Sequence, residues 1–228
     1  MITRSSPRHE RKFVPESLSL AGALALVRRH PAAFVEAYPE RMVNNLYFDS
    51  PGLINYFDHV TGAGRRRKVR IRWYGADSGL IERPVLECKL KRGAVSWKES
   101  LALPPARVDG GACDGLVAAC RGAPGLPEEF RHLLRFVQPV VANRYRRFYF
   151  VSPQWGIRLT VDCQLEFFGL RAKGQRPWQA FARGPQVVLE LKYPAEKAEE
   201  VAWIANQFPF RPARCSKYVL AIQIVCGG

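Results

Sequence analysis

The sequence predicts an α+β fold, a closed antiparallel eight-stranded β-barrel whose lumen is charged and whose outside is flanked by helices. Three observations predict it. About eight short runs of strand-forming residues are separated by turn residues at hairpin spacing, which suits a small closed barrel. Charged residues alternate with apolar ones along several runs, and three segments have helical patterns. At 228 residues, we expect residues 1–228 to form a single domain.

The strands are predicted first, from apolar runs bounded by turn signals such as Lys91-Arg92-Gly93. The expected strands are Glu10–Val14, Asn44–Asp49, Lys68–Tyr74, Val85–Lys91, Ser96–Leu103, Val140–Val151, Ile157–Leu165 and Val187–Tyr193. Because consecutive runs lie a few residues apart, we expect antiparallel hairpins rather than parallel crossovers.

Helices are predicted in three places, and the tail of the chain is ambiguous. Residues 17–29 have helical spacing, with Ser17 as the expected cap. A second helical region lies between residues 113 and 136, interrupted by prolines and glycines at 122–127, and a third runs from about 195 to 208. Residues 216–225 fit a helix or a strand equally well. These helices could cover the outer face of the barrel.

The charge balance indicates a polyanionic partner. The chain has 35 lysines and arginines against 20 acidic residues, which gives a net charge of +15. Uncompensated charge on this scale favours nucleic acid, an acidic membrane or polyphosphate as the partner. No apolar run is long enough to cross a bilayer. The six cysteines have no metal-binding spacing, and we expect reduced thiols in a cytoplasmic protein.

The order of the charges along the strands is more specific than their number. From Lys68 to Trp73 every second residue is basic and the others are apolar, so the basic residues share one face of a strand. The same spacing recurs at Glu87, Lys89 and Lys91, at Arg158, Thr160, Asp162 and Gln164, at Glu190 and Lys192, and at Glu10 and Lys12.

A solvated sheet face is the ordinary explanation of such alternation in any one strand. Two features of the whole set favour a binding site instead. Arginine dominates the strand that starts at Lys68, and arginine suits two-pronged contacts with phosphate. Isolated carboxylates also lie among the cations, which is the composition expected where phosphates meet a divalent metal. The charged faces would then line the lumen.

Eight segments carry a resemblance to a known family. They are Glu10-Arg11-Lys12-Phe13, Asn45-Leu46-Tyr47-Phe48-Asp49-Ser50, Arg70-Ile71-Arg72-Trp73-Tyr74-Gly75, Leu86-Glu87-Cys88-Lys89, Tyr145-Arg146-Arg147, Arg158-Leu159-Thr160-Val161-Asp162, Leu189-Glu190-Leu191-Lys192 and Arg214-Cys215-Ser216-Lys217-Tyr218. In this order, the chain resembles the VTC-type polyphosphate polymerase domain of the triphosphate tunnel metalloenzyme (CYTH-like) superfamily. Two positions depart from the pattern: Arg214 replaces a lysine, and Ser100 replaces an arginine.

The resemblance assigns expected roles. Catalytic roles are implied for Lys12, Arg70, Arg72, Lys89, Arg158 and Glu190, and substrate binding for Lys98, Arg147, Lys192, Arg214 and Lys217. A Mn²⁺ or Mg²⁺ ion would be held by Glu190, helped by Glu10 or Asp162. The motif leaves open which of Arg144, Arg146 and Arg147 faces the lumen.

Three functions are compatible with these features. The first is synthesis of polyphosphate from the γ-phosphate of ATP, and the second is hydrolysis of tripolyphosphate or a nucleoside triphosphate. The third is a non-catalytic module that binds polyphosphate or RNA. Trp73 and Tyr193 alternate away from the charges, whereas nucleic-acid readers place aromatic rings beside their basic residues. We therefore expect ATP, triphosphate or polyphosphate as the partner rather than nucleic acid.

Overall fold

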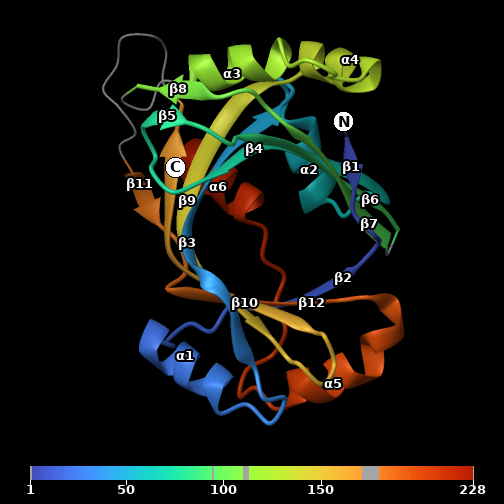
Figure 1. Ribbon diagram of the computed structural model, residues 1–228, viewed down its shortest axis with the longest axis vertical. Coiled ribbons are helices and arrows are strands. Elements are labelled where there is room, and N and C mark those ends of the chain that lie inside the picture. Colours follow the sequence, from blue (N-terminus) through green and yellow to red (C-terminus); the bar gives the residue numbers. More distant parts are fainter. Residues whose placement is uncertain (1, 94, 110–112, 171–179, 228) are drawn as a thin grey trace.

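The fold consists of one large curled antiparallel sheet with helices packed on it (Figure 1). The computed structural model describes residues 2–93, 95–109, 113–170 and 180–227. The strands are β1 (Thr3–Arg4), β2 (His9–Phe13), β3 (Val35–Asp49), β4 (Arg65–Tyr74), β5 (Gly79–Ile81), β6 (Val85–Arg92), β7 (Val95–Ala102), β8 (Ala106–Val108), β9 (Gln138–Val151), β10 (Arg158–Gly169), β11 (Ala180–Arg183) and β12 (Val187–Tyr193).

The strand order in the large sheet is β1-β7-β6-β4-β3-β9-β10-β12-β2, with β11 paired to β10. Strands β5 and β8 form a separate two-stranded sheet. The helices are α1 (Leu20–Arg28), α2 (Ile54–Val60), α3 (Asp114–Arg121), α4 (Glu128–Phe136), α5 (Ala198–Asn206) and α6 (Lys217–Cys226). A 3₁₀ turn at Ala195–Lys197 precedes α5. Within the described residues, no helix is both long and apolar enough to cross a membrane.

The prediction of a closed eight-stranded barrel was wrong, because the sheet is an open half-barrel. Its edge strands β1 and β2 are consecutive in the chain and do not pair with each other. Among the described residues, the link between them makes two backbone bonds to β7, from Ser5 N–H to the Lys98 carbonyl (2.8 Å) and from Arg8 N–H to the Ser96 carbonyl (3.3 Å). Pro7 within the link has no N–H to donate, so a continuous ladder cannot form there.

The eight predicted strands are all present, and the differences lie at their ends and between them. Strand β3 starts at Val35, nine residues before the predicted Asn44. The short strands β1, β5, β8 and β11 and the helix α2 were not predicted. Helix α1 is capped by the Ser19 hydroxyl rather than by Ser17. The ambiguous tail is the helix α6, capped by Ser216.

The outer face of the sheet is apolar and is covered by helices, as the alternation predicted. Val69, Ile71 and Trp73 of β4 are fully buried in a cluster with Leu116 of α3 and Phe130 of α4. A second cluster packs the far end of the sheet against α1 and α5. Figure 1 shows these two pairs of helices at opposite ends of the molecule. The charged residues of the same strands are therefore turned toward the inside of the curl.

Helix α6 lies inside the curl rather than outside it (Figure 1). Its residues Tyr218, Ala221 and Ile222 pack against Val43 and Val141. These valines lie on the same face of the sheet as the charged residues. Asn45 is opposite Arg72, and Val43 precedes Asn45 by two positions. Val141 is opposite Tyr47, which is itself opposite Arg70. Thus α6 fills one end of the inner space, and its N-terminal residues border what remains.

One buried carboxylate attaches α2 and α6 to the sheet. Asp49, fully buried at the end of β3, accepts hydrogen bonds from the backbone N–H groups of Ser50, Asn55 and Tyr56 (2.7–3.0 Å). It also accepts from the Asn55 side-chain amide (2.8 Å) and from the Tyr218 hydroxyl. Leu53, the residue before α2, has no side chain that could cap the helix. The Asp49 carboxylate accepts hydrogen bonds from the free N–H groups there instead.

Replacing Asp49 with alanine should lower the free energy of unfolding by roughly 3 kcal/mol, because several buried donors lose their acceptor at about 1–3 kcal/mol each. Chemical denaturation measures this change. Ser50→Ala is the control, since the Ser50 hydroxyl accepts a single exposed bond from Ile54 N–H. Equal, small losses for both variants would show that Asp49 does not organise this end of the sheet.

Candidate functional site

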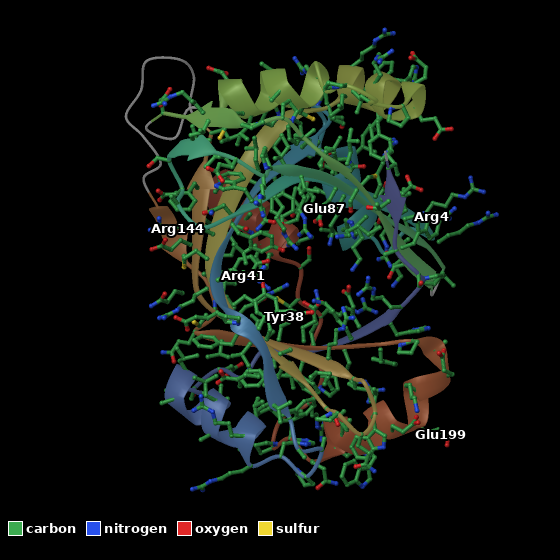
Figure 2. All side chains as sticks on the ribbon, in the orientation of Figure 1. Arg4, Tyr38, Arg41, Glu87, Arg144 and Glu199 are labelled. Atoms are coloured by element: carbon green, nitrogen blue, oxygen red, sulfur yellow. The ribbon has the colours of Figure 1, made fainter. Side chains whose placement is uncertain are left out.

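A cavity of about 300 Å³ lies inside the curl, next to the N-terminus of α6. Figure 2 shows side chains from all sides projecting into this space, with Glu87, Arg41 and Tyr38 labelled around it. Eleven basic side chains line it against two carboxylates, Glu10 and Glu190. The basic residues are Arg8, Lys12, Lys68, Arg70, Arg72, Lys89, Lys98, Arg147, Arg158, Lys192 and Lys217. The described lining therefore carries a surplus of nine positive charges.

Glu87 neutralises part of the wall formed by β4, β6 and β7. It lies opposite Arg70 in the β4–β6 ladder and is only 4% exposed. Its carboxylate accepts from Arg70 (2.6 and 2.8 Å) and from Lys98 Nζ (2.5 Å), with Arg72 at 3.8 Å. Burial alone would raise the pKa of Glu87, but these cations lower it well below its usual range. Glu87 is thus a fixed anion that holds the three cations in place.

Asp162 has the same role on the opposite wall. It lies opposite Arg147 in the β9–β10 ladder and is 0% exposed. Arg147 donates two bonds to it (2.5 and 2.7 Å), and Lys217 at the start of α6 lies 2.6 Å away. Burial acts to raise the pKa of Asp162, but Arg147 and Lys217 lower it below its usual range. Asp162 therefore joins β9, β10 and α6 behind the cavity wall.

Glu10 and Glu190 are the carboxylates that reach the cavity itself. Both lie 3.8 Å from Lys12 Nζ, because Lys12 is opposite Glu190 in the β2–β12 ladder and follows Glu10 by two positions. Lys89 adds a bond to Glu10 (2.5 Å) and Lys192 an ion pair to Glu190 (3.4 Å). Burial would raise the pKa of Glu190, but Lys12 and Lys192 hold it well below its usual value.

Three lining cations, Arg8, Lys68 and Arg158, have no carboxylate within ion-pair distance among the described residues. Lys68 Nζ donates instead to the Ser216 hydroxyl (2.8 Å) at the α6 cap. Burial, and then the neighbouring Lys12 and Lys89, hold the pKa of Lys68 well below its ordinary value. An anion that enters the cavity would stabilise the charged form of Lys68, so this lysine marks a place where a ligand charge is favoured.

The predicted site residues are brought together with few exceptions. Those lining the cavity are Lys12, Arg70, Arg72, Lys89, Arg158, Glu190, Lys98, Arg147, Lys192, Lys217 and Glu10. Asp162 lies behind the wall, and the exposed Arg214 is not among the lining residues. Of the three arginines left open by the motif, Arg147 faces inward, whereas Arg144 pairs with Glu166 and Asp77, and Arg146 with Glu40, on the other face.

Sequence reasoning missed Arg8 and a set of aromatic rings, and it assigned no role to Lys68 although it placed Lys68 on the charged face. Arg8 and Lys68 continue the period-two spacing of their strands and could have been included on that ground. Trp73 and Tyr193 are buried in the core, but Tyr38, Tyr47, Tyr145, Tyr149 and Tyr218 line the cavity. Aromatic rings therefore do lie beside the charges in this site, and the argument against nucleic acid that rested on their absence does not hold.

The carboxylates fit a metal ion only in part. Among the described residues, no group of three or more His, Cys, Asp or Glu side chains could hold a metal by itself. Asp162 is occupied by Arg147 and Lys217. Glu10 and Glu190 lie together beside Lys12, and Mg²⁺ is commonly held by one or two carboxylates together with phosphate oxygens and water. These two residues fit a metal that arrives with a phosphate ligand.

Two lining groups titrate near pH 8. Burial lowers the pKa of Lys192 to about 8, although Glu190 acts to raise it. Burial would raise the pKa of Tyr145, but Arg147 and Arg72 outweigh burial and lower it to about 8. Deprotonation of Lys192 removes a positive charge from the cavity, and deprotonation of Tyr145 adds a negative one. The field that an anion meets therefore weakens as the pH rises through 8.

Comparison with known proteins places the fold. The VTC domain family matches residues 7–226. A protein from Bacillus halodurans provisionally named an adenylate cyclase is similar in structure, with 13% identity, 92% of this chain and 95% of that chain covered, and a TM-score of 0.54. A conserved hypothetical protein from Pyrococcus furiosus has 15% identity, 93% and 99% coverage, and a TM-score of 0.51.

A protein from Hippeastrum, provisionally named an adenylyl cyclase and described as having a dominant triphosphatase activity, is also similar. It has 14% identity, 96% coverage of both chains and a TM-score of 0.50. At such identities these likenesses establish the common fold alone. No curated protein sequence matches the chain.

The titration of Lys192 predicts a pH-dependent affinity for a linear polyanion such as tripolyphosphate. Above pH 8 each binding event must take up a proton at Lys192, so through this group the affinity should fall by about fivefold between pH 8 and pH 9. Lys192→Arg keeps the charge at all these pH values and should make the profile less steep, leaving the part due to Tyr145. Calorimetric titrations at pH 7, 8 and 9 measure both proteins, and the ionisation of the ligand cancels in the comparison. Identical profiles would contradict the assignment.

Proposed function

The chain belongs to the VTC domain family, as its motifs predicted, and from this premise we propose that it transfers phosphoryl groups on a linear phosphate chain held in the cavity. The activity we propose is polyphosphate synthesis from the γ-phosphate of ATP. The observation that carries the proposal is the surplus of cations: eleven basic side chains against two carboxylates in one small cavity. A chain of phosphates is a ligand with enough closely spaced negative charge to match it.

The cations would act by position and charge. Phosphoryl transfer needs little covalent chemistry from a protein and depends on alignment of the phosphates and stabilisation of their charge. Arg70 and Arg72 on one wall and Arg147 on the other are held by Glu87 and Asp162, so their guanidinium groups need little reorganisation when phosphate binds. Arg8, Lys68 and Arg158, which have no carboxylate partners in the described chain, would be free to contact the ligand.

Glu10 and Glu190 would hold a divalent cation, Mn²⁺ or Mg²⁺, which when bound supplies charge neutralisation at the phosphoryl group. Lys12 lies 3.8 Å from both carboxylates and restrains them in the absence of ligand. Once a phosphate chain enters, Lys12 can contact the phosphates instead. Oxygens of Glu10 and Glu190 are then available to the metal. The lysine would therefore link phosphate binding to the exposure of the two carboxylates.

Hydrolysis of tripolyphosphate or a nucleoside triphosphate is the second candidate. It is favoured by the fold that the chain shares with the Hippeastrum protein described as a triphosphatase. It is also favoured by the exposed rim of the cavity, where Tyr38 is 60% exposed and water can enter. Both candidates use the same cavity and differ in whether a phosphate chain or water accepts the phosphoryl group.

The products formed from ATP and Mn²⁺ distinguish the two reactions. We expect the purified protein to form polyphosphate and ADP in step, with little orthophosphate, when the products are separated by gel and by chromatography. Orthophosphate and ADP in equal amounts without polymer would establish the hydrolase instead. No turnover of ATP or of tripolyphosphate with either metal would leave only a binding module and overturn the proposal.

Glu190→Gln and Arg70→Ala should separate chemistry from binding. Glu190→Gln keeps the shape and removes one negative charge, so metal affinity should fall and turnover should drop by about 100-fold or more, while metal-free tripolyphosphate binds as well or better. Arg70→Ala should weaken tripolyphosphate binding with or without metal. Arg146→Ala is the matched control, since Arg146 faces away from the cavity. Full metal-dependent turnover in Glu190→Gln would refute the role of this carboxylate.

A further inference from the structure

An irregularity in β3 turns a tyrosine into the cavity. Opposite residues in the β3–β9 ladder are Tyr38 with Tyr149 and Arg41 with Arg147, so β3 advances three residues where β9 advances two. This extra residue is a β-bulge beside Pro39, a residue that sheets tolerate at bulges. In a regular strand Tyr38 and Arg41 would point to opposite faces. The bulge places both on the inner face.

The tyrosine joins a cluster of rings around one cation. The Tyr38 and Tyr149 rings meet edge to face, with centroids 6.0 Å apart and planes at 90°. The Arg41 guanidinium lies 5.8 Å from the Tyr38 ring, 5.6 Å from that of Tyr74 and 5.9 Å from that of Tyr149. These are cation–π distances that hold the cluster in shape. Yet Tyr38 is 60% and Tyr74 47% exposed, so the rings are not part of the core.

The cluster adjoins the cations at the end of the cavity away from α6. Tyr149 follows Arg147 by two positions on β9 and therefore lies on the same face, about 7 Å further along the strand. Tyr38 and Tyr149 line the same cavity as Arg72 and Arg158. Along β3 and β9, the inner wall thus passes from Arg41 and Arg147 to exposed aromatic rings, while Arg158 and Lys192 continue the cations beyond this level on β10 and β12.

A buried hydroxyl lies where the two zones meet. Thr160 is opposite Tyr149 in the β9–β10 ladder and opposite Glu190 in the β10–β12 ladder. It lines the cavity and is 5% exposed, and its hydroxyl has no hydrogen-bond partner among the described residues. Buried polar groups are normally satisfied, so this hydroxyl points to a polar group of a ligand.

We propose that the rings of Tyr38 and Tyr149, held by Arg41, form a stacking platform for a nucleobase, so that the cavity takes a nucleoside triphosphate with its phosphates toward α6. The inference rests on the proposed function of the cavity and deepens it. A nucleoside triphosphate matches the order along β3 and β9, with a flat ring beside the tyrosines and a chain of anions beside the arginines. Base stacking on aromatic rings is tolerant of base identity, so purine and pyrimidine nucleotides would both bind, purines more tightly.

Binding measured by calorimetry with two ligands, ATP and tripolyphosphate without metal, tests the platform. Tyr38→Ala should weaken ATP by roughly 5- to 150-fold, the loss expected for one stacked base. Its affinity for tripolyphosphate should stay within about twofold. Tyr38→Phe keeps the ring and should bind ATP like the wild type, and Tyr149→Leu should repeat the selective loss. Phe136→Ala, which removes another exposed ring (61%) on α4, should affect neither ligand.

The outcomes separate this inference from the function on which it rests. If the wild type binds tripolyphosphate but Tyr38→Ala leaves ATP affinity unchanged, or weakens both ligands by the same factor, the platform is refuted and the phosphate site stands. If the wild type binds neither ligand, the proposed function fails and the platform fails with it. Thermal unfolding of each variant shows whether the fold is intact, which the exposure of Tyr38 leads us to expect.

Discussion

The crowding of like charges inside one cavity is the constraint on which the rest of the structure depends. Two cations 4 Å apart repel each other by about 4 kcal/mol at an effective dielectric constant of 20. Eleven such groups line a cavity of about 300 Å³. Glu87 and Asp162, buried behind the wall, offset part of the repulsion by pairing with Arg70, Lys98, Arg147 and Lys217. The remaining excess of positive charge favours the binding of an anion in the cavity.

The fold accommodates these charges because the apolar and charged faces of its curled sheet are exchanged relative to an ordinary small barrel. Apolar residues face outward under α1, α3, α4 and α5, and the charged residues face inward. Helix α6 fills one end of the inner space and presents Ser216 and Lys217 to the cavity. Its position depends on the bonds that Tyr218 makes to Asp49 and that Lys217 makes to Asp162. Asp162, which holds Arg147, thus also holds α6 in place, together with Asp49.

Sequence periodicity predicted the parts of this arrangement that repeat every two residues. The alternation from Lys68 to Trp73 correctly separated the buried outer face from the charged inner one. The gap between the edge strands β1 and β2 was not predictable from this periodicity. Closure of the barrel depends on a four-residue link containing Pro7 rather than on any strand. Tyr38 lies before Asn44, where the strand was predicted to start, and a regular period could not have placed it either. A β-bulge breaks the period at that point, so the pattern that places Arg70 and Arg147 would put Tyr38 on the wrong face.

The most direct test of the central claim compares a chain of phosphates with a single one. Thermal unfolding would be followed with tripolyphosphate and with orthophosphate at equal concentration and ionic strength. Cations spread along the wall should favour the longer anion, so tripolyphosphate should stabilise the protein far more, by about 2.7 kcal/mol at 100 times its Kd. Equal, small shifts for both anions would contradict a site built for a chain of phosphates.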